Sequence, residues 1–176
     1  MDASAWNARY LAQPDAWGTT PAARIVAEVT AAEDTGLDVG TAVDLACGDG
    51  RHARWLAAHG WQVQAVDFSE VAIEQARAKD SDDGRSGSVD WVVGDATTWA
   101  PSEAVDLVVV GFLHLDLPAL TAVLRSAGTW LRPGGHLVYL GHAAENLRRG
   151  VGGPQDPTVL PDIADLARGA EGLEVV

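Results

Sequence analysis

The sequence contains very little cysteine and lysine and few basic residues of any kind. Cys47 is the only cysteine among 176 residues, so the chain cannot form an intrachain disulfide or a cysteine-rich metal site. Lys79 is the only lysine, and 12 lysine and arginine residues stand against 25 aspartate and glutamate residues, which gives a net charge of −13. Polyanions are bound through basic faces that displace their counterions. This charge balance therefore disfavours nucleic acids and acidic membrane surfaces as partners.

Targeting and membrane signals are also missing from the sequence. The longest apolar run, around residues 107–113, is too short to span a bilayer. The first six residues lack the basic and apolar regions of a signal peptide. We therefore expect a cytoplasmic protein with no membrane partner. The five histidines are scattered without metal-ligand spacing, so no metal site is expected.

Two patterns alternate along the chain from residue 40 onward. Short apolar runs predict strands at residues 41–46, 61–66, 89–93, 105–110 and 136–140, and helical patterns lie between them at 51–59, 70–79 and 119–131. Continuous apolar runs are typical of parallel strands that are covered by helices on both faces. Gly60 ends one helix, Ser69 caps the next, and residues 132–135 form a turn before the fifth strand. The predicted fold is a doubly wound, Rossmann-like α/β domain with a mainly parallel sheet.

The length predicts one domain, with its core at residues 40–141. Residues 1–39 form an N-terminal helical cap with two helices, one at 5–11 and one that starts at Thr20–Pro21 and runs to 34. Residues 142–176 contain a glycine- and proline-rich segment at 150–157, a helix at 161–168 and the start of a sixth strand at 173–176. We expect the C-terminal strands of the sheet to be truncated, and the oligomeric state is left open.

A glycine-rich turn follows the first predicted strand, in the pattern Asp44-x-Ala46-x-Gly48-x-Gly50. Glycines at this place let backbone amides approach a ligand closely, and the following helix N-terminus favours an anionic group. The spacing from Gly48 to Ala53 also fits the dinucleotide-binding fingerprint. Asp44 argues against that interpretation, because its charge would repel a pyrophosphate and attract an ammonium group.

Two more carboxylates follow the next two predicted strands. Asp67 stands where an acidic side chain accepts ribose hydroxyls, and Asp95, in Gly94-Asp95-Ala96, is placed to accept a hydrogen bond from an adenine amino group. Either carboxylate is also suited to capping the turn or helix that follows it. Because parallel strands end at one edge, we expect Asp44, Asp67 and Asp95 to face one crevice.

These motifs resemble those of the class I S-adenosylmethionine-dependent methyltransferases. The N-terminal residues Trp6 to Tyr10, with Trp17-Gly18 and residues 141–146, are similar to the small-molecule branch related to thiopurine and tellurite-resistance methyltransferases. The resemblance implies a seven-stranded sheet, S-adenosylmethionine as cofactor and a small-molecule methyl acceptor. Its implied cofactor-binding residues are Asp44, Ala46, Gly48, Gly50, Asp67, Phe68, Asp95, Ala96 and Gly111. Arg9 and Trp17 of the N-terminal segment are further candidates.

The implied roles follow the parts of the cofactor. Asp44 would hold the methionine ammonium, with Gly48 and Gly50 beside the methionine part and Gly111 near the sulfonium. Asp67 would hold the ribose, Phe68 would flank the adenine, and Asp95 with Ala96 would read its edge. Arg9 is a candidate for the cofactor carboxylate or for a surface ion pair, and Trp17, like Trp6, for shielding the sulfonium or for packing.

His114 and His142 follow the fourth and fifth predicted strands, on the side where α/β proteins bind ligands. Each is a candidate catalytic base, and each is equally suited to orienting a loop through backbone hydrogen bonds. Two other functions stay open at this point: an NAD(P)-dependent reductase, which the glycine spacing and Asp67 favour, and a non-catalytic cofactor-binding module.

Overall fold

The computed structural model describes residues 2–15, 17–80 and 85–176. The sheet has five strands, all parallel, in the order β3-β2-β1-β4-β5. The strands are β1 (Thr41–Leu45), β2 (Gln62–Asp67), β3 (Ser88–Val93), β4 (Val105–Gly111) and β5 (Leu131–Leu140). The five strands predicted between residues 41 and 140 are confirmed. The register places Asp44 of β1 between Ala65 of β2 and Val109 of β4, in the middle of the sheet.

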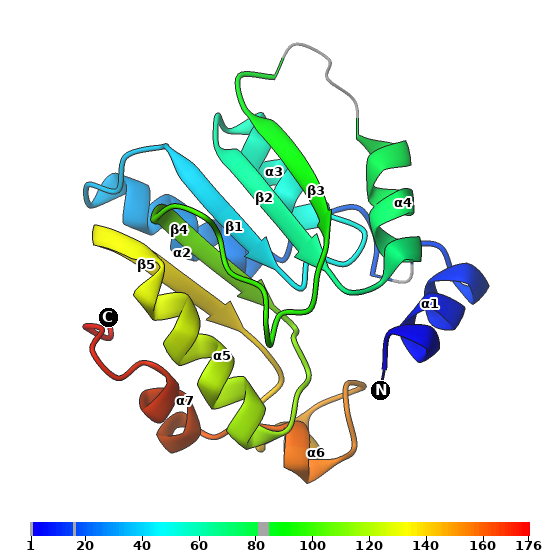
Figure 1. Cartoon of the computed structure of the whole chain (residues 1–176). Coiled ribbons are helices and arrows are strands. Elements are labelled where there is room, and N and C mark those ends of the chain that lie inside the picture. Colours follow the sequence, from blue (N-terminus) through cyan, green and yellow to red (C-terminus); the bar gives the residue numbers. More distant parts are fainter. Residues whose placement is uncertain (1, 16, 81–84) are drawn as a thin grey trace.

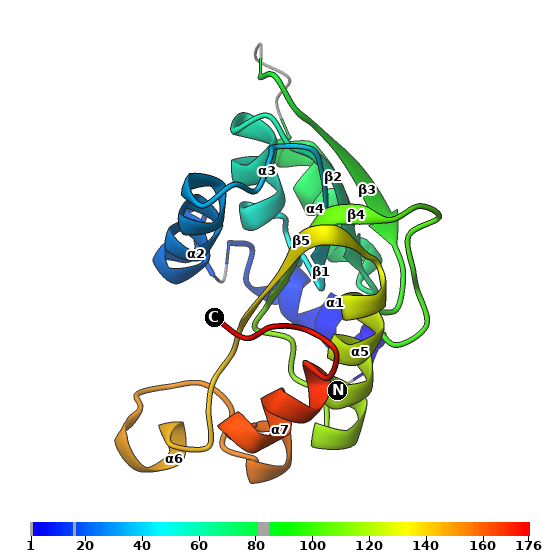
Figure 2. The ribbon, with the colours of Figure 1, turned by 90° about the vertical axis from the view of Figure 1, so that its left-hand side faces the viewer.

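Helices cover both faces of the sheet, as the doubly wound prediction requires. One face packs against α2 (Ala23–Asp34), α3 (Arg51–Ala58) and α4 (Glu70–Lys79), and the other against α5 (Leu117–Thr129) with α7 (Ile163–Gly169) behind it (Figure 2). Each face has its own apolar core. Ile25, Leu56, Trp61 and Ile73 are fully buried in the first, and Val43, Leu45 and Val108 are fully buried in the second.

The cover of the second face is incomplete. The connection between β3 and β4, residues 94–104, contains no helix, so the helical cover of that face comes from α5 and α7. Along β2 and β3 the residues that point to the uncovered side are Gln62, Gln64, Ser88 and Asp90, while their neighbours Val63, Ala65, Val89 and Trp91 join the first core. The alternation of polar and apolar residues in these two strands follows from this one-sided burial.

An N-terminal helix, α1 (Ala3–Ala12), lies beside α4 at the carboxyl ends of the strands (Figure 1). The Asp2 side chain caps it by accepting a hydrogen bond from the Ala5 amide at 2.9 Å. Two side-chain bonds attach it to α4 and its cap: Ser69 Oγ donates to Asn7 Oδ1 at 2.6 Å, and Gln75 donates to the Tyr10 carbonyl at 3.0 Å. The N-terminal cap therefore contributes residues to the edge where ligands bind in such sheets.

Two predicted boundaries are wrong. The second helix begins at Ala23, and no side chain caps it. The Ala22 amide, which the predicted Thr20 cap would have bound, donates to the ring of His52 at 3.2 Å. The fifth strand begins at Leu131 and not at residue 136. A register shift against β4 accommodates the glycine-containing residues 132–135 inside the strand, so they do not form a separate turn.

The predicted start of a sixth strand is also wrong. Residues 173–176 pair with no strand: the Leu173 amide bonds to the Ala170 carbonyl at 2.9 Å, and the Leu173 side chain lies against Gly128 of α5. Packing of one leucine on α5 replaces strand pairing here. The short helix α6 (Asn146–Arg149) and the 3-10 turn η1 (Pro157–Val159) lead to α7, whose start has a capping box between Asp162 and Asp165.

In the part of the chain that the structure describes, no helix is both long enough and apolar enough to cross a membrane. The same residues contain no group of three or more His, Cys, Asp or Glu side chains arranged to hold a metal ion.

Candidate cofactor site

The turn after β1 follows a backbone path that few side chains tolerate. Ala46, Gly48 and Gly50 have φ values of 60°, 57° and 82°, and Gly50 is the N-cap of α3. A β-carbon on Gly48 would lie 2.6 Å from the Tyr10 hydroxyl, and one on Gly50 would lie 2.2 Å from the Trp91 ring. Tyr10 and Trp91 occupy the space beside the two glycines, and this packing together with the positive φ leaves no room for side chains.

Asp44 is fully buried at the end of β1, and neither of its carboxylate oxygens has a hydrogen-bond partner among the described residues. Burial raises the pKa of Asp44 to about 7, and the charge of Asp67 adds to the increase. The Ala53 amide and the cations of Arg51 and Arg54 act in the opposite direction without making a hydrogen bond. A buried carboxylate without a partner destabilises a fold.

Asp67, at the end of β2, connects the glycine turn to α4. Its Oδ2 accepts the Gly48 amide and its Oδ1 accepts the Ser69 amide, both at 2.9 Å. Burial raises the pKa of Asp67, whereas these two amide bonds oppose the increase. Each oxygen keeps a lone pair for a further donor, such as a ribose hydroxyl.

Phe68 and Asp95 line one open pocket of about 540 Å³ together with Val93, Gly94, Thr97, Leu115 and the first residues of α1, Asp2 and Ala3. Asp95 Oδ1 accepts the Thr97 amide at 2.8 Å and the Thr97 hydroxyl at 2.7 Å, so this carboxylate does cap the following turn. Ala96 packs partly buried on the α5 side of the sheet. The pocket therefore brings together Phe68 and Asp95, two of the residues expected around an adenine. Asp95 also caps the turn through Thr97.

Gly111 ends β4 with its α-carbon against the His52 ring and Ile25, so this position packs on the interior. His52 is 4% exposed and accepts the Ala22 amide, which gives it a structural role. Burial and, to a smaller extent, the positive charge of Arg51 lower the pKa of His52 to about 4.

Arg9 of α1 lies between two tryptophans. Its guanidinium carbon is 5.3 Å from the Trp6 ring centre and 4.7 Å from the Trp17 ring centre. Arg51 of α3 donates to the Trp17 carbonyl at 2.8 Å and lies over the Phe112 ring. Arg9 and Arg51 have no carboxylate partner in the described residues. The crevice is therefore edged by two cations in an otherwise acidic chain.

His114 and His142 lie side by side although 28 residues separate them. Nε2 of His114 is 3.1 Å from Nδ1 of His142, and the rings are stacked with centres 5.3 Å apart. The Phe112 amide donates to the Leu140 carbonyl at 2.7 Å, which continues the pairing of β4 and β5 beyond Gly111 and brings the two loops together.

The family model described as "Methyltransferase domain" matches residues 42–135, which cover β1 to the start of β5. This match includes Asp44, the glycine turn, Asp67 and Asp95. The chain belongs to the methyltransferase-domain family.

Relatives and solved structures agree with this family membership. A trans-aconitate 2-methyltransferase of Methylobacterium radiotolerans is 30% identical over 134 residues, which cover 75% of this chain and 47% of that protein. A ribosomal RNA small subunit methyltransferase C of Alcanivorax borkumensis is 35% identical over 104 residues, 56% of this chain and 31% of that protein. The structure of the N-methyltransferase NodS of Bradyrhizobium japonicum with S-adenosyl-L-homocysteine superposes with a TM-score of 0.74 at 21% identity, covering 100% of this chain and 88% of that one. This methyltransferase-family chain thus spans a third to a half of the length of these two curated relatives.

Sequence reasoning missed an ion pair behind the glycine turn of this methyltransferase-family chain. Asp49, between the two glycines, is 2% exposed, and its Oδ2 accepts from Lys79 of α4 at 2.8 Å. Lys79 also pairs with Asp15, which joins α4 to the loop after α1. The one lysine of the chain therefore holds the glycine turn through Asp49. Its rarity in an acidic sequence is the feature from which this ion pair could have been predicted. Tyr10 was expected only as part of the N-terminal segment Trp6 to Tyr10, and its contact with Gly48 was not predicted.

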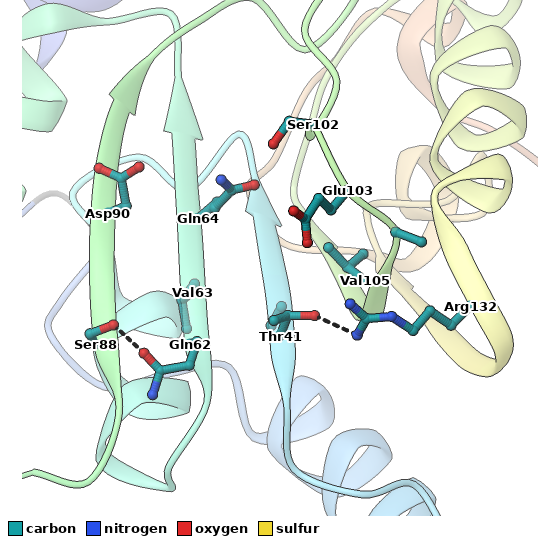
Figure 3. Close-up of a pocket in the computed structure, with 12 residues that line it drawn as sticks. Thr41, Gln62, Val63, Gln64, Ser88, Asp90, Ser102, Glu103, Val105 and Arg132 are labelled. Carbon is teal, nitrogen blue, oxygen red and sulfur yellow. Dashed lines mark hydrogen bonds between the residues drawn. The ribbon is translucent and has the colours of Figure 1, made fainter.

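A second pocket, of about 250 Å³, lies at the opposite end of the strands (Figure 3). Its walls come from the amino ends of β1 to β4 and from Arg132, and Arg132 bonds to the Thr41 hydroxyl and to Asp106. None of the family motif residues lines it. Ligands of parallel α/β sheets bind at the carboxyl ends of the strands, so the candidate site of this family member is the carboxyl edge of the sheet around Asp44 and Asp67.

Proposed function

We propose that this chain is an S-adenosylmethionine-dependent methyltransferase that acts on a small molecule. Asp44 is the observation that carries the proposal. A fully buried carboxylate without a hydrogen-bond partner, at the end of the central strand, requires a cationic or donor group from a ligand. The ammonium of the methionine part of the cofactor is such a group, and family membership independently suggests the cofactor.

The remaining residues fit the same cofactor. Asp67 has unused lone pairs for the ribose hydroxyls, and the pocket between Phe68 and Asp95 is suited to an adenine ring. Arg9, which has no carboxylate partner in the described residues, is placed on α1 to receive the cofactor carboxylate. Gly48 and Gly50, with their positive φ, would shape the turn beside the methionine part.

When bound, S-adenosylmethionine supplies a methyl group that is already electrophilic. The tasks left to the protein are to orient an acceptor and to keep water away. Helix α1, attached to α4 through Asn7 and Gln75, covers one side of the crevice. We assign the glycine-rich residues 150–157 to a lid over the other side, where Gly152 accepts from Asn146 at 2.9 Å.

A small-molecule acceptor follows from the charge and from the relatives. The net charge of −13 opposes a polyanionic RNA, because RNA binding depends on basic faces. The trans-aconitate relative matches three quarters of this chain, whereas the ribosomal RNA relative matches about half. Methylation of RNA is the alternative that an acceptor panel must include.

Calorimetry with S-adenosyl-L-homocysteine and with NADH tests the cofactor. We expect micromolar binding of the former and none of NADH, because the Asp44 carboxylate would repel a pyrophosphate. Preference for NADH would instead support a reductase. A methyl-transfer assay with tritiated S-adenosylmethionine then separates an enzyme from a non-catalytic cofactor-binding module, which would bind the cofactor and methylate no small molecule or RNA.

A further inference from the structure

His114 and His142 form a pair whose hydrogen bond couples the proton positions of the two rings. Of two neutral imidazoles in contact, one donates an N–H and the other accepts with a lone pair. The contact joins Nε2 of His114 to Nδ1 of His142 at 3.1 Å. If His114 donates, its Nδ1 is left with a lone pair, and no described residue forms a hydrogen bond to that nitrogen.

The surroundings differ for the two rings. His142 is enclosed by the Phe112 ring, 5.5 Å between centres, and by Gly153, where a β-carbon would lie 2.7 Å from Nε2. His114 instead lies within electrostatic reach of Arg9 on α1, the helix beside the cofactor crevice. Nε2 of His142 is therefore packed against Gly153, whereas no described residue forms a hydrogen bond to Nδ1 of His114.

We propose that His114 is the catalytic proton acceptor for a methyl acceptor with an N–H or O–H group, and that His142 is a positioning residue that holds His114 in its Nε2–H tautomer. This inference rests on the proposed methyltransferase function and narrows its substrate class. A carboxylate or a thiolate is already ionised and needs no base, whereas an amine, an imidazole or a phenol must lose a proton.

The reaction balances with these two residues. The acceptor nitrogen or oxygen bonds to the methyl carbon while the carbon–sulfur bond breaks and its electron pair stays on sulfur. The acceptor proton moves to Nδ1 of His114, whose new positive charge is shared through the Nε2–H bond to His142. The proton passes to water after the product leaves.

The charges around the pair keep the base available. Burial, the His142 ring and Arg9 lower the pKa of His114 to about 4, in that order. Arg51 adds a cation over the Phe112 ring that contacts His142. His114 is consequently neutral at pH 7, so that its Nδ1 lone pair is free, although the lowered pKa also makes the ring a weaker base.

NMR of ring-¹⁵N-labelled protein tests the pair without any acceptor. At pH 7 we expect His114 to carry its proton on Nε2, with this proton shifted downfield by its hydrogen bond to His142. His142→Phe should remove the downfield shift, while His142→Asn, whose amide oxygen still accepts, should preserve it. A proton on Nδ1 of His114 in the wild-type chain would overturn the assignment. His59→Asn, at the exposed C-cap of α3, is the matched control.

Transfer of tritiated methyl groups to a panel tests the substrate class. Primary amines, imidazole and phenol form one set, and trans-aconitate and small thiols form the other. We expect turnover in the first set, a loss of about 100-fold in kcat for His114→Asn, about 10-fold for His142→Phe, and recovery in His142→Asn. KM for S-adenosylmethionine should stay within twofold throughout.

Turnover confined to carboxylates or thiols, or rates insensitive to His114→Asn, would refute the proposal. Lack of turnover with every N–H and O–H acceptor would also count against it. Failure of the proposed function looks different, since S-adenosyl-L-homocysteine would then not bind in calorimetry while the NMR result for the pair still holds.

Discussion

The backbone amide of Gly48 donates to Oδ2 of Asp67 at 2.9 Å, so the end of β2 holds the turn that follows β1. Asp67 also accepts from Ser69, the N-cap of α4. One carboxylate thus connects the glycine turn and two neighbouring strands. The same side chain fixes the shape of the proposed cofactor site and offers lone pairs to the ribose.

Asp67→Asn should weaken binding of S-adenosyl-L-homocysteine by at least 10-fold in calorimetry. The asparagine amide has one acceptor oxygen for two backbone donors, so either Gly48 or Ser69 loses its partner, at a cost of about 1–3 kcal/mol in the free energy of unfolding. Asp90→Asn, on the exposed amino half of β3, is the control and should change neither measurement. Unchanged affinity in Asp67→Asn would refute the ribose assignment.

Asp44→Asn should stabilise the free protein while weakening its binding of S-adenosyl-L-homocysteine. Burial raises the folded-state pKa of Asp44 to about 7, so the folded protein favours the protonated form of this side chain. The stability that protonation contributes is therefore complete below pH 4 and is lost as the pH rises to 7. The free energy of unfolding of the variant should therefore exceed that of the wild type increasingly across this range, by roughly 2–4 kcal/mol above pH 7. Urea unfolding at several pH values measures this gain, with exposed Asp38→Asn as the control. Equal stability of wild type and variant at pH 8 would contradict the assignment.

His52→Gln should remove part of the acid sensitivity of the fold. The pKa of His52 is lowered to about 4, so neutral His52 favours the folded state above pH 6.5 and this contribution is lost as the pH falls towards 4. The free energy of unfolding of the wild type should fall by about 3 kcal/mol between pH 6.5 and pH 4 because of His52 alone. Unfolding of His52→Gln should show a smaller slope, whereas exposed His59→Gln should behave like the wild type. Identical slopes in all three proteins would rule out this role.

Gly48→Ala should disturb the site through a clash with Tyr10 as well as through backbone strain. The new β-carbon would lie 2.6 Å from the Tyr10 hydroxyl, at a φ of 57°. We expect a loss of about 2 kcal/mol or more in stability and a weaker affinity for S-adenosyl-L-homocysteine. Gly134→Ala has a positive φ of 85° but open space, so it reports strain alone.

A double variant separates the two effects in Gly48→Ala. Adding Tyr10→Phe removes the hydroxyl oxygen and should recover the clash part of the loss, which a double-mutant cycle measures. Complete additivity of the two substitutions would show that α1 does not pack on the glycine turn in solution.

Much of the fold could be predicted because its evidence is local. The five apolar runs became the five strands, and Ser69 caps α4 by accepting the Ala72 amide at 3.1 Å. The wrong boundaries have non-local causes. The start of α2 depends on the ring of His52, 30 residues away, and the early start of β5 depends on a register shift against β4. Residues 173–176 were mistaken for a strand because β-branched composition does not reveal that Leu173 packs on α5.

The order of motifs along the chain, and with it the expectation of one crevice lined by Asp44, Asp67 and Asp95, came from the sequence by itself. Apolar periodicity locates strands, and parallel strands end at one edge. Only the tertiary structure decided which groups touch: Gly48 with Asp67, Asp49 with Lys79, and His114 with His142. The physical reason is that these contacts depend on strand order and register, which bring together residues 19, 30 and 28 positions apart.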